Sequence, residues 1–284
     1  MSNGIDISHH NVIDLTKLSY DFCICKATEG VNFNDSKFDE FMKTLGNLGK
    51  WRGAYHYANG KDIRTEGNLF ISRVKPYLDG YTLLCLDWEQ QNNALFNSGS
   101  DEAWCRRWCD YVKEQTGCTP VIYVQSSMVD KVKGTGYPLW VARYATNDET
   151  GYQDTPTYGQ ISDCFIRQYT SRGKLSGYGG RLDLDKLYGT YKQWMEYSGY
   201  KEETKEPEET PSLPYEPLKK WKARKRNLYT VQEGDYLEDI AEKFRVTVDD
   251  IKATNAFVKE HGFIYVGMRL AIYTETDIRG TLNG

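Results

Sequence analysis

Apolar and polar positions over about the first 190 residues follow a pattern typical of strands separated by helices. Short apolar, β-branched or aromatic runs predict eight strands, at residues 4–8, 22–27, 53–58, 81–89, 119–125, 139–144, 165–171 and 181–187. Amphipathic stretches between several of them predict helices over residues 35–48, 62–78, 100–115 and 126–132. The alternation indicates an α/β fold with a parallel sheet, and eight strands is the number that closes a barrel. Because the helical spacers fade after residue 144, we expect loops to join the last strands.

The remaining chain has a different pattern. Residues 197–227 are rich in Glu, Lys and Pro and poor in aliphatic residues, which is the composition of an extended linker. Residues 228–274 then predict strand, helix, helix and strand, in a module that is small for an independent domain. We therefore expect a barrel domain over residues 1–196, a linker over 197–227, a βααβ module over 228–274 and a frayed tail over 275–284.

The candidate chemistry lies at the end of the run YTLLCLDWE, residues 81–89. Leu83 to Leu86 are apolar, yet the strand ends in two carboxylates, Asp87 and Glu89. Residues i and i+2 project from the same face of a strand, which places the two backbones ~6–7 Å apart. In a parallel barrel the carboxyl ends of the strands form the catalytic rim. The bulky Trp88 between the two acids is expected to point away from the cavity.

Other predicted strands also end in polar or aromatic side chains that would converge at the same mouth. They are Asp6, Lys26, Glu29, Tyr57, Tyr123, Gln168, Tyr169, Asp183 and Asp185. A single aspartate in such a place is most simply a solvated loop residue or one half of a buried salt bridge. The whole set favours a site, because several uncompensated carboxylates in one cavity cost stability and raise the pKa of at least one of them.

Composition narrows the class of protein. With 36 basic and 40 acidic residues in 284, the chain lacks the basic footprint of a nucleic-acid binder. The start MSNGIDISHHN has no apolar signal-peptide core, and we expect neither a spanning helix nor membrane insertion.

The seven cysteines sit in apolar runs or on a Trp-rich helical stretch, which argues for buried thiols. Without CxxC spacing or a histidine pair, we expect no metal site and no cofactor.

Paired carboxylates beside aromatic rings are typical of the active sites of glycoside hydrolases. In these enzymes one acid protonates the leaving oxygen and the other stabilises or attacks the developing cation. The 22 tyrosines and 7 tryptophans also suit a sugar-binding surface. The sequence contains no GxSxG, P-loop, strand-linked GxGxxG or HExxH motif, so serine acyl transfer, nucleotide chemistry and metalloproteolysis lack support.

Six ordered motifs over roughly residues 1–195 resemble glycoside hydrolase family 25, the lysozymes of phages and bacteria. They are GIDISHHN, ICKATEG, GAYHYA, LDWE, LWVARY and RQYTSRGKLSGYGGRLDLDKLYG. The resemblance implies an irregular (β/α) barrel of eight strands and about five helices.

By the same resemblance, Glu89 is the general acid and Asp87 the partner at the anomeric centre. Asp6 and Asp183 are the flanking carboxylates, which completes the expected catalytic set. Substrate contacts are expected at Lys26, Tyr57, Tyr123, Gln168 and Tyr169. The sequence departs from the family at Asp185, where an asparagine is more common, and the added charge either raises neighbouring pKa values or faces solvent.

The C-terminal module resembles a LysM domain, a binder of N-acetylglucosamine-containing glycans. The resemblance rests on YTVQEGDYLEDIAEKFRVTVDDIKATN and IYVGMRLAIY. It implies a sugar cleft between the loop after the first strand and the loop that begins after the second helix. The expected contacts are Gly234, Asp235, Tyr236, Leu237 and Asn255.

The two resemblances, to a lysozyme family and to a glycan-binding domain, both point to the bacterial cell wall and predict a peptidoglycan hydrolase. We expect an N-acetylmuramidase that cleaves the β-1,4 bond between N-acetylmuramic acid and N-acetylglucosamine. We expect a phage endolysin that resides in the host cytoplasm before lysis and acts on the bacterial cell wall after release; the sequence leaves the oligomeric state open. A bacterial autolysin is the second interpretation, and a non-catalytic glycan-binding barrel is a third. A chitinase is disfavoured, since its DxxDxDxE pattern would place aspartates where the chain has Thr82 and Cys85.

Overall fold

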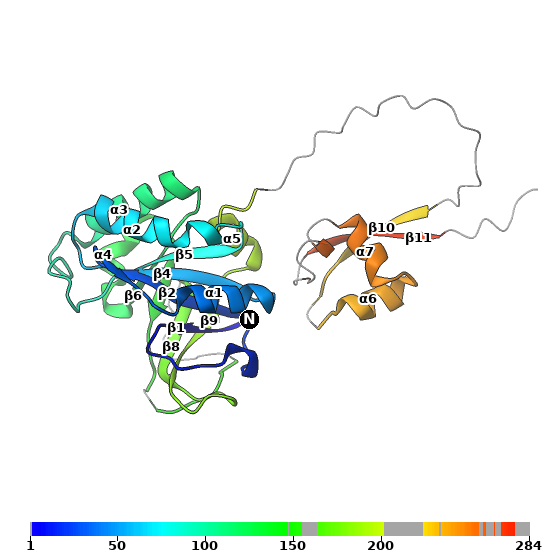
Figure 1. The fold of residues 1–284 in the computed structure, drawn as a ribbon, viewed down its shortest axis with the longest axis horizontal. Helices are drawn as coiled ribbons and strands as arrows, with labels where there is room; N and C mark the ends of the chain where they lie inside the picture. Colours follow the sequence, from blue (N-terminus) through cyan, green and yellow to red (C-terminus); the bar gives the residue numbers. More distant parts are fainter. Residues whose placement is uncertain are drawn as a thin grey trace, which may run out of the picture. The chain divides into compact units, whose positions relative to one another are not determined.

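The computed structural model describes residues 2–146, 148–154, 164–201, 224–232, 234–255, 258–259, 264 and 268–275. The chain divides into two compact units, with the boundary between residues 202 and 203 (Figure 1). Each unit has a hydrophobic core of its own. None of the described helices is long and apolar enough to cross a membrane.

The first unit is a closed barrel of eight strands, as the pattern of apolar runs predicts. The strands are β1 (Asn3–Ile7), β2 (Phe22–Glu29), β4 (Trp51–Tyr57), β5 (Thr82–Asp87), β6 (Val121–Gln125), β7 (Leu139–Ala142), β8 (Cys164–Gly173) and β9 (Leu182–Leu187). Neighbours pair in the order β1, β2, β4, β5, β6, β7, β8 and β9, and β9 pairs with β1 to close the barrel. The short strand β3 (Phe33–Asn34) adds a hairpin to β2.

One strand runs against the expected direction. Pairing is parallel from β1 through β8, but β9 is antiparallel to both β8 and β1. A loop of residues 174–181 joins β8 directly to β9, and with no crossover helix the chain can only return antiparallel. Asp183 and Asp185 therefore lie near the start of β9, not at the end of a parallel strand, and Asp183 still reaches the mouth because it pairs with Asp6.

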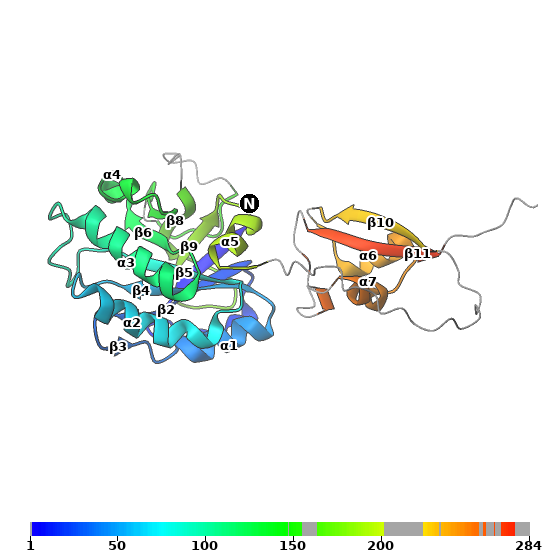
Figure 2. The ribbon, with the colours of Figure 1, turned by 90° about the horizontal axis from the view of Figure 1, so that it is seen from above.

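Helices cover the outside of the barrel (Figure 2). They are α1 (Phe38–Asn47), α2 (Ile63–Val74), α3 (Asp101–Thr116), the single turn α4 (Val129–Val132) and α5 (Tyr191–Tyr197). The first four fall within or next to the predicted ranges, whereas α5 was not predicted. Local signals fix several ends: the Asp62 side chain accepts from the Thr65 backbone N–H at the start of α2, and Gly117, with φ 75°, ends α3 in the left-handed conformation.

Side chains alternate between the barrel interior and the helix layer. Ile5, Ile7 and Leu184 pack in the main hydrophobic core, and Asp6, Asp183 and Asp185 alternate with them on the interior face. Trp88 points away from the cavity, as predicted, because its indole donates to Asp101 of α3 at 3.0 Å and stacks on Trp104. All seven cysteines lie in described residues and are present as thiols.

The second unit contains β10 (Arg224–Thr230), α6 (Leu237–Phe244), α7 (Val248–Thr254) and β11 (Arg269–Glu275). The two strands pair antiparallel, and Leu237, Ile240, Ile251 and Leu270 contribute to the core beneath the helices. Strand β10 begins at Arg224, four residues before the expected start of this module at residue 228. Residues 202–223 of the predicted linker and residues 276–284 of the predicted tail lie outside the described residues.

Candidate active site

Five carboxyl groups from three strands meet at one end of the barrel. Strand β1 supplies Asp6, β5 supplies Asp87 and leads to Glu89, and β9 supplies Asp183 and Asp185. Asp6 and Asp87 are only 8% and 7% exposed, Asp185 is fully buried, and Glu89 and Asp183 are partly exposed. The structure thus brings together all four predicted catalytic carboxylates, with Asp185 as a fifth group beneath them.

Burial raises the pKa of each of these acids above its ordinary value. For Asp87 the causes are burial first and then the charge of Glu89, partly offset by Lys26. For Glu89, burial raises the pKa, and this effect outweighs the opposing effects of a hydrogen bond with Tyr123 and of the charge of Lys26. Burial and the charges of Asp6 and Glu89 raise the pKa of Asp183 to about 8. With its pKa at about 8, Asp183 holds a proton near neutral pH, and the raised pKa of Glu89 favours the protonated form that a general acid requires.

Lys26 is a cation whose charge lowers the pKa values of both Asp87 and Glu89. Its ammonium donates to Glu29 at 2.6 Å, lies 4.7 Å from the centroid of the Tyr57 ring and 5.5 Å from that of Phe33. Tyr57 is fixed in turn by a hydrogen bond from its hydroxyl to the carbonyl of Gln91. The predicted contacts Lys26 and Tyr57 thus form one wall of the mouth, with a positive charge beside Asp87.

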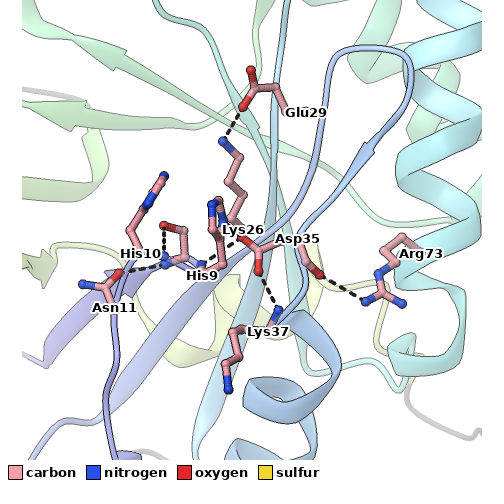
Figure 3. Close-up of polar contacts among 9 residues, drawn as sticks. His9, His10, Asn11, Lys26, Glu29, Asp35, Lys37 and Arg73 are labelled. Atoms are coloured by element: carbon pink, nitrogen blue, oxygen red, sulfur yellow. Dashed lines mark hydrogen bonds and ion pairs between the residues drawn. The ribbon is translucent and has the colours of Figure 1, made fainter.

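The loop after β1 continues this wall (Figure 3). The buried carboxylate of Asp35 accepts from the backbone N–H and from Nδ1 of His9, at 2.9 and 2.7 Å, and from the backbone N–H of Lys37. His9 in turn packs 5.5 Å from the ring of Phe33. These contacts hold the β1 loop against the β2–β3 hairpin that carries Lys26 and Glu29.

Tyr123 and Gln168 form the opposite wall of the mouth. The Gln168 amide donates to Asp6 at 2.8 Å, while its oxygen accepts from the hydroxyls of Tyr123 and Tyr144 at 2.9 and 2.5 Å. Beside them a groove of about 990 Å³ opens over the ends of β5, β6 and β7. Its lining includes Glu89, Phe96, Tyr123, Gln125, Arg143 and Tyr144. The volume and the mixture of rings and polar groups suit part of a glycan chain.

Tyr169 does not lie at this mouth. It is 3% exposed, packs in the hydrophobic core, and its hydroxyl accepts from the backbone N–H of Gln153. The register of β8 is irregular between Gln168 and Thr170, and at this point Tyr169 packs into the core while Gln168 faces the cavity and contacts Asp6. The prediction of a substrate contact at Tyr169 is corrected on this ground.

Three aromatic residues of the site were not predicted from the sequence. Tyr55 shares a strand face with Tyr57, and its pKa is raised by burial and then by the charges of Asp6 and Asp87. The Trp140 indole donates to Asp185 at 2.8 Å, and Tyr144 binds Gln168. The i, i+2 rule applied to Tyr57 could have found Tyr55, whereas the roles of Trp140 and Tyr144 depend on contacts with β9 and β8.

In the second unit, the side chains of two expected glycan contacts are hydrogen-bonded to other residues of the same unit. Asp235 accepts from the Tyr229 hydroxyl and the Gln232 backbone N–H, and the Asn255 side chain bonds both the N–H and the carbonyl of Ala271. Tyr236 is 67% exposed, Gly234 is exposed and Leu237 belongs to the core. Of the five residues, Tyr236 is thus the large side chain open to a ligand.

Paired carboxyls with raised pKa values, set among aromatic rings in a groove, supply a proton donor and a stabiliser for a sugar cation, and they define the first unit as a glycoside hydrolase. Comparison with known sequences narrows this class. The chain belongs to glycosyl hydrolases family 25, whose model matches residues 5–178. The LysM domain model matches residues 229–272, and the second unit is a LysM domain.

Individual relatives agree with this assignment. Lysozyme M1 of Streptomyces globisporus is 28% identical over 205 residues, which are 66% of this chain and 68% of that protein. A crystal structure of a bacterial lysozyme from Streptomyces coelicolor, 25% identical, superimposes with a TM-score of 0.56 over 70% of this chain and 97% of that one. The structure of the CTP1L endolysin, 27% identical, superimposes with a TM-score of 0.53 over 69% of each chain. The chain spans 47% to 64% of the length of the other curated relatives it matches.

Proposed function

We propose that the protein is an N-acetylmuramidase that hydrolyses the β-1,4 bond between N-acetylmuramic acid and N-acetylglucosamine in peptidoglycan. The observation that carries the proposal is the pair of a buried Asp87 and a partly exposed Glu89, both with raised pKa values, at the end of β5 in a family 25 barrel. Membership in that family and similarity to Lysozyme M1 support the choice of bond.

In this proposal Glu89 is the general acid. Burial favours its protonated form, and it lies at the edge of the groove where a leaving oxygen can reach it. Asp87 acts as the anion that stabilises the cation developing at the anomeric carbon, with Lys26 favouring its ionised form. Asp6 and Asp183 flank the pair, and Tyr57, Tyr123 and Gln168 position the sugar.

A phage endolysin is the biological role we propose, with accumulation in the host cytoplasm and access to the wall at lysis. Similarity to the CTP1L endolysin supports it. A bacterial autolysin is the second candidate, supported by a similarity of 26% over 57% of the chain to the autolytic lysozyme of Clostridium acetobutylicum. In either role the LysM domain would hold the barrel on its insoluble substrate and raise the local concentration of scissile bonds.

Analysis of the products tests the bond specificity. Purified peptidoglycan is digested with the full chain, reduced with borohydride and hydrolysed, and the new sugar alcohols are identified. We expect muraminitol from muramic reducing ends. Glucosaminitol as the new product would replace the muramidase by a glucosaminidase, and no new reducing ends would favour a non-catalytic glycan binder.

Removing the LysM unit separates binding from catalysis. A variant truncated after residue 202 keeps the whole barrel core, so we expect it to remain folded and to cleave small soluble wall fragments at the rate of the full chain. On intact walls it should be slower, because the tether is lost and the active site is not. Turbidity decay on walls and chromatography of soluble fragments measure the two rates. Equal rates on walls would exclude targeting by this unit.

A further inference from the structure

Asp185 is a carboxylate in an unusual place. It lies on β9 one level below the mouth, opposite Gly4 of β1, while Asp183 on the same strand face lies opposite Asp6. Its side chain is fully buried, which excludes the alternative that its charge faces solvent and leaves the alternative that it raises neighbouring pKa values, as it does for Asp6. A carboxylate so far from water needs either a cation or a proton to offset the loss of hydration.

No cation supplies that compensation among the contacts of the described residues. The buried cations next to this layer are Lys186 and Arg167, which alternate with Asp185 and Gln168 on their strands. Lys186 donates to the side chain of Asn3, and Arg167 donates to the carbonyl of Arg143. Lys26 acts on Asp87 and Glu89, whereas the charges that act most strongly on Asp6 and Asp185 are those of other carboxylates.

The hydrogen bonds of the pair leave one fully buried carboxyl oxygen without a donor among the described residues. Asp185 Oδ1 accepts from the Trp140 indole, and Asp6 Oδ2 accepts from the Gln168 amide. The buried Oδ2 of Asp185 has no N–H or hydroxyl donor in the described part of the chain. Asp6 and Asp185 lie on the same interior face of the neighbouring strands β1 and β9, two residues apart in register, and the charge of Asp185 raises the pKa of Asp6. Two carboxyl groups so placed can form a hydrogen bond only when one of them carries a proton.

We propose that Asp185 is a positioning residue that shares a single proton with Asp6, so that together they carry one negative charge instead of two. Asp6 then stands at the floor of the cleft as a carboxylic acid whose proton bridges to Asp185. The charge of the pair lies deep in the barrel, behind Asp6, and not at the sugar-facing surface beside Asp87.

This arrangement matters for the reaction because an ionised Asp6 raises the pKa of Asp87. With the proton held on Asp6, Asp87 ionises more readily and can stabilise a sugar cation. This consequence rests on the proposed function; the shared proton does not. The other titratable groups whose charges interact with the pair are Asp183, Asp87, Glu89, Tyr55, Tyr123, Tyr144, Tyr152, Tyr169, Cys23 and Cys85.

The variant Asp185→Asn tests the proposal, because an amide of the same shape donates to Asp6 but cannot share its proton. Carboxyl carbons of the full chain, labelled with ¹³C at aspartate, are followed by NMR across the pH range and assigned by substitution. In the wild type the Asp6 and Asp185 signals should titrate together in two steps. In Asp185→Asn the Asp6 signal should titrate in one step, with its pKa lowered by about one to three units.

The pH dependence of wall hydrolysis gives a second readout. Asp185→Asn places the full negative charge on Asp6, which raises the pKa values of the neighbouring Asp87 and Glu89. Both limbs of the kcat/KM profile should therefore move to higher pH, by about one unit. A merely structural role for Asp185 would lower the rate without moving the limbs.

The controls separate the possible outcomes. Asp14→Asn, an exposed carboxylate on the barrel, should leave the Asp6 titration and the pH profile unchanged. Asp6→Asn should reduce Asp185 to a single step, and it serves as the second variant if Asp185→Asn fails to fold. An Asp6 signal that titrates identically in the wild type and in Asp185→Asn would overturn the shared proton. Coupled titration in a chain without muramidase activity would retain the pair and reject the proposed function.

Discussion

Replacing Glu89 by glutamine is expected to abolish wall lysis while the fold persists. The substitution keeps the shape of the side chain and removes its proton, and proton transfer of this kind contributes about 10²- to 10⁴-fold to the rate. Because the side chain is largely buried and its pKa is raised, the neutral amide replaces a group that already favours its neutral form. The thermal midpoint of unfolding should therefore be unchanged or raised. Turbidity decay and calorimetry measure the two quantities.

The matched control for Glu89→Gln is Glu40→Gln on helix α1. Glu40 is exposed and forms a surface ion pair with Lys37, so the same chemical change there should leave lysis intact. If Glu89→Gln retained more than about a tenth of the wild-type rate, another group would have to be the proton donor. Asp183, with its pKa raised to about 8, would then be the next residue to test.

Asp87→Asn is expected to lower kcat by about 10²- to 10³-fold, the effect of losing one electrostatic stabiliser of a transition state. We favour this role over that of a nucleophile for a geometric reason. Asp87 and Glu89 are two residues apart at the end of β5, and in the proposed mechanism Glu89 protonates the leaving oxygen on one side of the sugar, so Asp87 is poorly placed to attack from the other. The 2-acetamido group of the substrate can make that attack itself. Asp130→Asn, an exposed change on α4, is the control.

Two observations distinguish this substrate-assisted route from its alternatives. It implies retention of the anomeric configuration, which NMR of the initial product reports, and no covalent bond between Asp87 and sugar. A glycosyl adduct on Asp87, trapped with a fluorinated substrate and seen by mass spectrometry, would make Asp87 the nucleophile. An inverted product would instead require a water molecule activated by one of the carboxylates.

The sequence by itself determined the eight strands and four of the helices of the barrel, and the place of the carboxyl pair Asp87 and Glu89 at its mouth. Both depend on short-range periodicity: two residues for a strand and 3.6 for a helix, interrupted by caps such as Asp62. Asp87 and Glu89 were predictable for the same reason, since one strand fixes their common face and the end of a barrel strand fixes their place at the mouth. Trp88 follows from the same alternation.

Only the tertiary structure decided which residues from different strands meet. The reversal of β9 sets the register that lays Asp183 against Asp6 and Asp185 beneath it, and no local pattern encodes a pairing between residues about 180 positions apart. Neighbouring strands also decide that Tyr169 packs in the core and that Tyr144 and Trp140 contact Gln168 and Asp185 at the site. Protonation in the acidic cluster depends on burial and on distances between such strands, and for that reason it is set by the closed barrel and not by the sequence of any one strand.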